Sequence, residues 1–162
     1  MDAEAAASLR RLLAERPVGA LATLHGGEPA VSMVPFVLPA GGTTLVIHVS
    51  ALATHTRDME RHPRVALLVM DEPGAGGLPP QALPRVALQC DAGPLAAGSE
   101  GHAAARAAYL ARFPESEVTF GLGDFALFGL QPVAARLVAG FGRAYSLVGA
   151  PLRDWLRATP PD

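Results

Sequence analysis

The sequence predicts a mainly β protein, a small antiparallel barrel with peripheral helices. At least six short apolar segments are separated by turns rich in Gly and Pro, a pattern typical of strands joined by hairpins. Half of the 162 residues are hydrophobic and only 6% are aromatic, so the core is expected to consist mainly of Ala, Leu and Val. A doubly wound sheet would require regular alternation of strands and helices, which this chain lacks. We expect residues 1–162 to form one domain.

The first element is an amphipathic helix, predicted over residues 3–15 within an N-terminal segment, 1–16. Its apolar side chains recur at helical spacing, and Pro17 ends it. The barrel is expected over residues 17–148 and begins with two strands, VGALATL and PAVSMVPFVL. The HGGE between them contains a Gly-Gly pair, which supplies the positive φ angles of a tight hairpin turn. Pro35 lacks a backbone N–H, which indicates a sheet edge or a bulge there.

A third strand, TTLVIHVS, leads into a second helix. From Ala51 to His62 the apolar residues adopt helical spacing, with Ser50 as the predicted N-cap and Pro63 as the terminator. RVALLVM and PRVALQCDAG are then predicted as strands on either side of a loop rich in Pro and Gly.

The remainder is predicted to form a long helix, a closing hairpin and a terminal helix. SEGHAAARAAYLARF has the pattern of a helix that opens at Ser99 and closes before Pro114. DFALFGL and VAARLVAGF are predicted as two strands joined by a turn at Gln131 and Pro132. PLRDWLRA is predicted as a short helix in the C-terminal segment, 149–162.

Composition narrows the setting and the partners. The net charge is −2 and all 13 cationic side chains are Arg. No nucleic-acid footprint is therefore expected, and any anion bound through a cationic side chain must be met by a guanidinium. The acidic N-terminus does not resemble a signal peptide, and no apolar run reaches membrane-spanning length. The single cysteine, Cys90, excludes an intrachain disulfide and fits a reducing, cytoplasmic location. We expect no membrane partner.

The run HVSALATHTRDM gathers polar side chains at the exit of a buried strand. Ser50, Thr54, His55, Thr56 and Arg57 span the first turns of the predicted helix, where free backbone N–H groups and the helix dipole favour an anion. A phosphate fits this pattern, with hydroxyls donating to it and Arg57 supplying a charge-assisted hydrogen bond. The alternative is that Ser50 caps the helix and the other polar side chains form a solvated face.

Other candidate residues also have simple structural explanations. Arg85 opens a strand and points either into an interface or into solvent. The run GFGRAYSL allows a flat ligand to approach the backbone beside Arg143, or forms a tight turn. His48, His62 and His102 lack the spacing of metal ligands, so no metal site is expected. No Ser/His/Asp or Cys/His arrangement stands out, and catalytic residues stay unidentified.

The order of these motifs resembles the pyridoxamine 5′-phosphate oxidase-like FMN-binding split barrels. The segments that carry the likeness are GGEPAVSMVPFVL, HVSALATHTRDMERHPRVALLV and VAGFGRAYSL, and the likeness covers residues 9–148. Within that superfamily the sequence is most similar to the heme-utilisation, heme-degrading branch, without its C-terminal domain. The resemblance implies a six-stranded antiparallel split barrel with Greek-key connections. It also implies a homodimer with an FMN in each of two grooves at the subunit interface.

The resemblance assigns cofactor contacts by position. It places the flavin phosphate on Ser50, His55, Thr56 and Arg57. It runs the flavin ring along the backbone of Val31, Ser32, Met33 and Val34. It brings the Arg85 side chain to the cofactor and places the closing loop of Phe141, Gly142 and Arg143 near the ring.

Two departures shape the functional hypotheses. The C-terminal segment that binds the substrate phosphate in pyridoxamine phosphate oxidases is missing, and no histidine follows His102. The leading hypothesis is a cytoplasmic, dimeric FMN-binding oxidoreductase acting on an unidentified small substrate, with the flavin supplying the redox chemistry. The alternatives are a heme-binding or heme-degrading protein, a non-catalytic flavin or heme module, and a barrel that has lost its cofactor.

Overall fold

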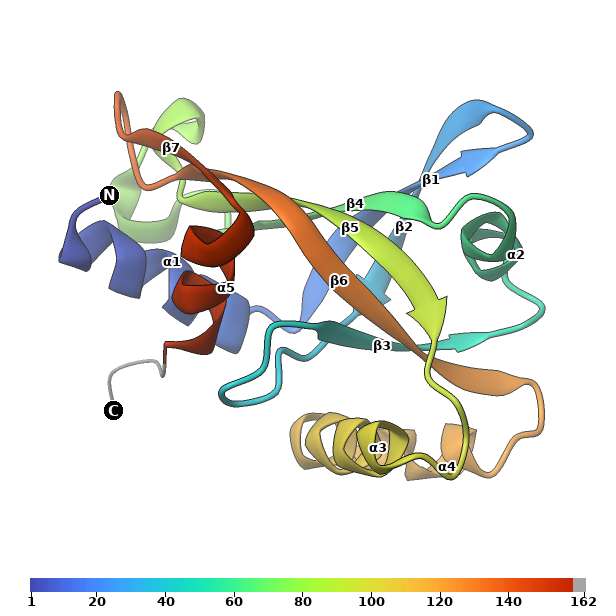
Figure 1. The fold of residues 1–162 in the computed structure, drawn as a ribbon. Coiled ribbons are helices and arrows are strands. Elements are labelled where there is room, and N and C mark those ends of the chain that lie inside the picture. Colours follow the sequence, from blue (N-terminus) through green and yellow to red (C-terminus); the bar gives the residue numbers. More distant parts are fainter. Residues whose placement is uncertain (159–162) are drawn as a thin grey trace.

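A curled antiparallel sheet is the centre of the fold. In the computed structural model, which describes residues 1–158, this sheet contains seven strands in the order β2-β1-β4-β5-β6-β3, with β7 paired to the second half of β6. The strands are β1 (Val18–His25), β2 (Glu28–Pro35), β3 (Leu45–Ser50), β4 (Arg64–Met70), β5 (Arg85–Pro94), β6 (Phe125–Val138) and β7 (Ala144–Val148). An isolated bridge between Val37 and Val46 draws the segment after β2 towards β3, and the sheet closes into a half-open barrel (Figure 1).

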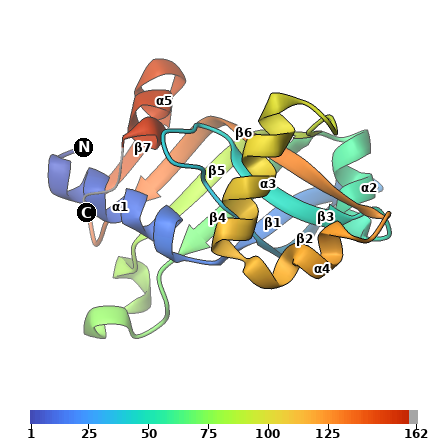
Figure 2. The same cartoon turned by 90° about the horizontal axis from the view of Figure 1, so that it is seen from below.

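Five α-helices surround the sheet in the described chain. They are α1 (Ala3–Glu15), α2 (Thr54–Arg61), α3 (Glu100–Arg112), α4 (Glu117–Phe120) and α5 (Gly149–Arg157). In Figure 1, α1 and α5 lie together at one end of the sheet and α2 lies at the other. Figure 2 shows α3 and α4 lying over β3. Short 3-10 turns cover Ala75–Gly77, Pro80–Ala82 and Pro114–Ser116.

Most of the predicted elements are confirmed. The N-terminal helix has the predicted bounds, and Asp2 caps it by accepting a hydrogen bond from the Ala5 N–H at 2.8 Å. Ser99 caps α3 as expected, because its Oγ accepts from the His102 N–H at 3.1 Å. The turn between β1 and β2 uses Gly26 and Gly27 at φ angles of 61° and 91°, which few other residues adopt. The predicted C-terminal segment extends over residues 159–162, which lie outside the described part.

Two apolar clusters hold the elements together. The larger cluster fills the inside of the sheet against α1 and α5, and its fully buried members include Leu21, Phe36, Leu67, Leu88 and Leu130. A smaller cluster packs α3 and α4 onto β3 and includes Val37, Val46, Ala105, Tyr109 and Leu127. Alternation of buried and exposed residues along β1 and β4 directs one set of side chains inward and the other outward.

The predicted closing hairpin is wrong, because Gln131 and Pro132 lie inside one continuous strand. Along one edge of β6 the partner strand changes. Pairing with β3 extends as far as Leu130 of β6, and pairing with β7 begins at Ala134 of β6. On the other edge the register with β5 shifts at this point, so Val133 has no partner. A proline lacks a ladder donor but is tolerated at such a bulge. The true final hairpin joins β6 to β7.

None of the helices in residues 1–158 is long and apolar enough to cross a membrane. Cys90 lies in β5 with no exposed surface, and burial raises the pKa of its thiol to about 12. The thiol is therefore protonated at neutral pH and behaves as a small apolar side chain. The cytoplasmic location stays a prediction.

Candidate functional site

The end of β3 meets the start of β6 at Ser50 and Asp124. The Ser50 Oγ donates a hydrogen bond to Asp124 Oδ2 at 2.6 Å, and the Ala51 N–H donates to the Asp124 carbonyl at 2.6 Å. The Leu52 N–H donates to the same Ser50 Oγ at 3.1 Å. We call residues 50–57 together with Asp124 the strand–helix junction.

The prediction that Ser50 caps the second helix is wrong. The chain makes an extra turn, closed by a hydrogen bond from the Ala53 N–H to the Ser50 carbonyl at 3.1 Å, before α2 begins at Thr54. Ala53 occupies the N-cap position and has no side-chain acceptor to offer. The Ser50 hydroxyl lies too early in the chain and is bound to the Asp124 carboxylate instead.

Two other predicted phosphate ligands, Thr56 and Arg57, donate hydrogen bonds to backbone carbonyls within the junction. The Thr56 Oγ1 donates to the Ser50 carbonyl at 2.7 Å, and Thr56 is only 2% exposed. Arg57 is exposed, and its Nη2 donates to the Leu52 carbonyl at 3.1 Å. His55 is half-buried, and burial lowers its pKa although Asp58 acts in the opposite direction. The imidazole of His55 is therefore neutral at neutral pH.

A buried carboxylate on α2 forms the polar cluster that sequence analysis missed. Asp58 is 1% exposed; its Oδ2 accepts from the Thr23 Oγ1 at 3.0 Å, and its Oδ1 lies 2.9 Å from His25 Nδ1. The His25 hydrogen bond is the main cause that lowers the pKa of Asp58, so this carboxylate is ionised. An ionised Oδ1 can only accept, so Nδ1 of His25 carries the proton. The Nε2 of His25 is then free, on a side chain 61% exposed.

Strand β2 presents its predicted residues to opposite faces. Val31 and Met33 point outward and are 71% and 66% exposed, whereas Val34 is buried in the main core and Ser32 is half-buried. Two of the four side chains are therefore available to a ligand or a partner on the outer face of the sheet.

Arg85 lies at the first residue of β5 and is half-buried. Its Nη1 donates to the carbonyls of Gln81 and Leu83, at 3.2 Å and 3.0 Å. These hydrogen bonds hold the preceding loop against the strand.

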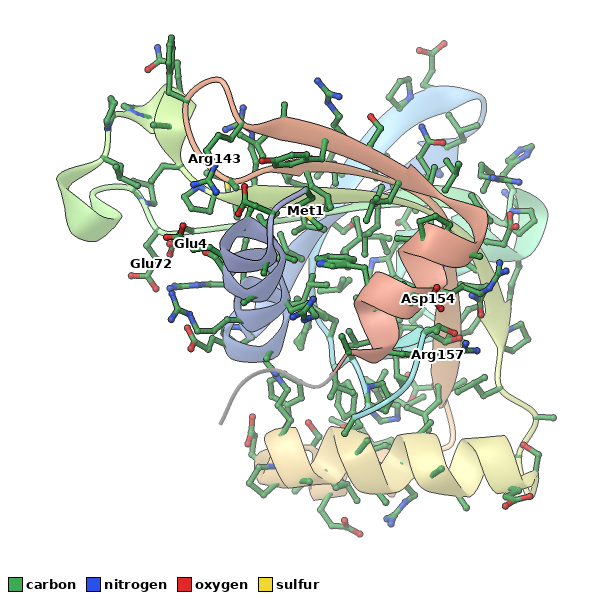
Figure 3. All side chains as sticks on the ribbon, turned by 60° about the vertical axis from the view of Figure 1, so that its left-hand side comes forward. Met1, Glu4, Glu72, Arg143, Asp154 and Arg157 are labelled. Carbon is green, nitrogen blue, oxygen red and sulfur yellow. The ribbon has the colours of Figure 1, made fainter. Side chains whose placement is uncertain are left out.

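The turn between β6 and β7 contains the last predicted residues. Phe141 is 85% exposed, and Gly142 next to it has a φ angle of 73°. The Arg143 Nη2 lies 2.9 Å from both carboxylate oxygens of Asp2, at the N-terminal end of α1 (Figure 3). The Ala5 N–H, Arg143 and Tyr145 together lower the pKa of Asp2 to about 2, so this ion pair is present at neutral pH. Arg143 is thus bound within its own chain.

The predicted residues outside β2 form two groups at opposite ends of the sheet. Ser50 pairs with the first residue of β6, and Arg85 pairs with the last, Val138. A strand of this length extends over roughly 40 Å at about 3.3 Å per residue. The strand–helix junction therefore lies far from Arg85. Figure 1 shows α2 and the turn between β6 and β7 at opposite ends of the sheet.

Metal ligands are not clustered in the described residues, where no three His, Cys, Asp or Glu side chains gather around one point. His48 is 8% exposed and stacks on Phe120, with ring centroids 3.9 Å apart. Burial lowers the pKa of His48, so its ring is neutral and packs within the smaller cluster. His25 remains the histidine whose orientation is set by a carboxylate.

Comparison with known proteins identifies the family. The sequence family described as pyridoxamine 5′-phosphate oxidase matches residues 5–139. This chain belongs to that family. The resemblance inferred from the motifs and the predicted split barrel are both confirmed.

The relatives of this pyridoxamine 5′-phosphate oxidase family member carry heme in their names. Heme oxygenase HutZ of Vibrio cholerae is 34% identical over 148 residues, which cover 88% of this chain and 80% of HutZ. The chloroplastic non-canonical heme oxygenase HOZ of Arabidopsis thaliana is 34% identical over 122 residues, 75% of this chain and 35% of HOZ. A heme binding protein from Mycobacterium smegmatis has a TM-score of 0.82 and 30% identity over 95% of this chain and 62% of that protein. The chain thus spans about a third of HOZ and less than two thirds of the mycobacterial protein.

The leading hypothesis of an FMN-dependent oxidoreductase is wrong. HutZ, HOZ and the mycobacterial protein are named for heme, which supports the heme alternative within this family. At the strand–helix junction the Ser50 hydroxyl, which was expected to meet a flavin phosphate, donates to the Asp124 carboxylate. The contacts assigned to individual site residues stay predictions.

Proposed function

We propose that this protein binds heme, as its substrate or cargo. The observation that carries the proposal is the 34% identity to a heme oxygenase over 88% of the chain. Heme is a flat apolar ring with an iron atom and two carboxylates, and it carries no phosphate. A heme site therefore does not need the Ser50 hydroxyl, which is already bound to Asp124.

His25 is the iron ligand in this proposal. In the described residues this imidazole is not part of a cluster of three potential ligands, which suits an iron whose other positions are filled by a porphyrin. The contact with Asp58 fixes the orientation and the tautomer of the ring, as carboxylates do for metal-binding histidines elsewhere. His25 lies at the same end of the sheet as the strand–helix junction, because Asp58 belongs to α2. One N–H of Arg57 donates to the Leu52 carbonyl, and the other N–H groups of this exposed guanidinium are available there for a heme carboxylate.

The partner in this proposal is a second copy of the chain. The outer face of β2, β1 and β4 is apolar and includes Val31, Met33, Val18 and Met70, each at least 40% exposed. Exposed apolar surface of this kind marks an interaction face. The two groups of predicted residues at opposite ends of one chain can contribute to one site only if one group comes from a partner. A symmetric dimer brings the strand–helix junction of each subunit to the β6–β7 turn of the other. The exposed Phe141 of that turn then stacks on the heme ring.

Hemin titration tests the heme proposal. We expect the wild-type protein to retain hemin through desalting, one per chain, with a Soret band distinct from that of free hemin. Replacement of His25 by Ala should shift that band and weaken binding by about tenfold or more, because the iron loses its oriented imidazole. The matched variant His62→Ala removes an exposed histidine from the end of α2 and should leave spectrum and affinity unchanged.

The outcomes of the titration separate the two claims. A wild-type protein that passes hemin through the desalting column overturns the heme proposal. If both proteins retain hemin and the spectra of wild type and His25→Ala are identical, His25 is rejected as the iron ligand and the heme proposal stands.

Light scattering during size-exclusion chromatography tests the dimer. The chain has a mass of 16.7 kDa, and we expect a measured mass of about twice that value. Met33→Glu should lower the measured mass to that of the monomer, because the dimer interface would bury a carboxylate. The control Val118→Glu places the same charge on α4, where the original side chain is 75% exposed, and should leave the mass unchanged. A wild-type monomer at micromolar concentration would reject the proposed partner.

A further inference from the structure

The Ser50 hydroxyl has no proton left for a ligand. A hydroxyl carries one O–H, and here it is directed to Asp124 Oδ2 at 2.6 Å. The oxygen also accepts from the Leu52 N–H at 3.1 Å, which fixes its orientation. The backbone holds the carboxylate in place, because the Ala51 N–H donates to the carbonyl of Asp124 at 2.6 Å.

Thr56 and Arg57 reinforce this closed arrangement. The buried Thr56 hydroxyl donates to the Ser50 carbonyl at 2.7 Å and so fixes the start of the loop formed by residues 50–52. Arg57 donates to the Leu52 carbonyl at 3.1 Å and holds the other side of the same loop. Ser50, Thr56 and Arg57 each contribute a hydrogen bond that shapes residues 50–52.

The charge at this point also opposes a phosphate. A phosphate oxygen that accepted a hydrogen bond from Ser50 would displace Asp124 Oδ2 and lie beside its carboxylate. Two like charges this close repel, and the partly buried setting of both residues weakens the screening by water. At the strand–helix junction the Ser50 O–H is already donated, and the negative charge of Asp124 lies next to it.

We propose that Asp124 determines ligand specificity by excluding phosphate monoesters, FMN included, from the strand–helix junction. The residue leaves ligands without a phosphate unaffected. This claim rests on the contacts of Ser50 and Asp124 and does not depend on whether heme binds.

Comparison of FMN with riboflavin tests the proposal, because the two flavins differ only by the phosphate. Binding is measured by quenching of flavin fluorescence or by calorimetry. We expect wild type to bind FMN no more tightly than riboflavin. Asp124→Asn keeps an amide oxygen that accepts from Ser50 but removes the charge, and it should bind FMN at least about tenfold more tightly than wild type does. Its riboflavin affinity should not change.

Two further variants make the result specific. Asp154→Asn removes one negative charge from the exposed surface of α5 (Figure 3) and should bind both flavins as wild type does. Adding Ser50→Ala to Asp124→Asn should reverse part of the gain, since the hydroxyl that turns from the neutral amide oxygen to the phosphate is then missing. The gain should also shrink as salt is raised.

Two outcomes would overturn the proposal. One is a wild-type protein that binds FMN at least ten times more tightly than riboflavin. The other is an Asp124→Asn variant that has a wild-type circular dichroism spectrum and melting temperature but gains no FMN affinity. Hemin is titrated into the same samples, so a failure to bind hemin alongside a gain for FMN rejects the heme proposal and leaves this one standing.

Discussion

Phe36→Ala is expected to lower the free energy of unfolding by about 3–5 kcal/mol. The Phe36 ring has no exposed surface and lies in the larger apolar cluster, just after the end of β2. Its backbone N–H donates to the Pro17 carbonyl at 3.2 Å, which ties this point to the start of β1. Truncation would leave a cavity that the surrounding strands cannot close, because their positions are fixed by the sheet hydrogen bonds.

Denaturant unfolding followed by the fluorescence of the single tryptophan, Trp155, measures this loss. Trp155 is 5% exposed and packs in the same cluster, so its emission reports the main core. Phe141→Ala is the matched control, because that ring is 85% exposed, and its loss should alter stability by no more than about 0.5 kcal/mol. Similar losses for the two variants would contradict the packing described here.

Thr23→Val should cost about 1.5–3 kcal/mol of stability, the usual range for a hydrogen bond to a charged group. Valine matches threonine in shape, so packing is kept while Asp58 Oδ2 loses its donor. Both residues are buried, and no water replaces the hydroxyl without a rearrangement of α2. Since Asp58 also orients His25, we expect the variant to retain hemin less well than wild type.

The same denaturant assay measures the effect of Thr23→Val. Thr43→Val makes the same chemical change at a half-buried position whose hydroxyl has no hydrogen bond within the described residues, and it should be nearly neutral. The pKa of Asp58 is lowered in the folded protein, so its contribution is complete above the ordinary value near pH 4 and is lost as the pH falls further. The difference between wild type and Thr23→Val should therefore shrink below about pH 4. A difference independent of pH would assign the effect to packing.

Local signals explain which elements were predictable from the sequence. The helices α1 and α3 begin at residues that cap them, Asp2 and Ser99, and their apolar residues follow helical spacing. The turn at Gln131 and Pro132 was predicted from a proline that in fact lies at a bulge of β6. Whether a proline ends a strand or lies at a bulge depends on neighbouring strands, and those come from distant parts of the chain.

The candidate site was predictable only in part for the same reason. Motif order located the strand–helix junction and the β6–β7 turn, but the partners that determine their chemistry are remote in sequence. Asp124 meets Ser50 across 74 residues, and His25 meets Asp58 across 33. No spacing rule links residues so far apart, so a hydroxyl that is already bound looked like a free phosphate donor.

The change of partners along β6 leaves β3 and β7 without a common hydrogen-bonded neighbour segment, and we expect these two edges to exchange amide hydrogens independently. The first half of β6 carries β3 and, through it, α3 and α4, whereas the second half carries β7 and α5. Residues 131–133, between these halves, lack a ladder partner on one edge, so opening on one side need not propagate to the other. Slowest exchange should then be found where β5 and β6 pair, since that ladder spans both regions, and the β3 and β7 edges should open in separate events.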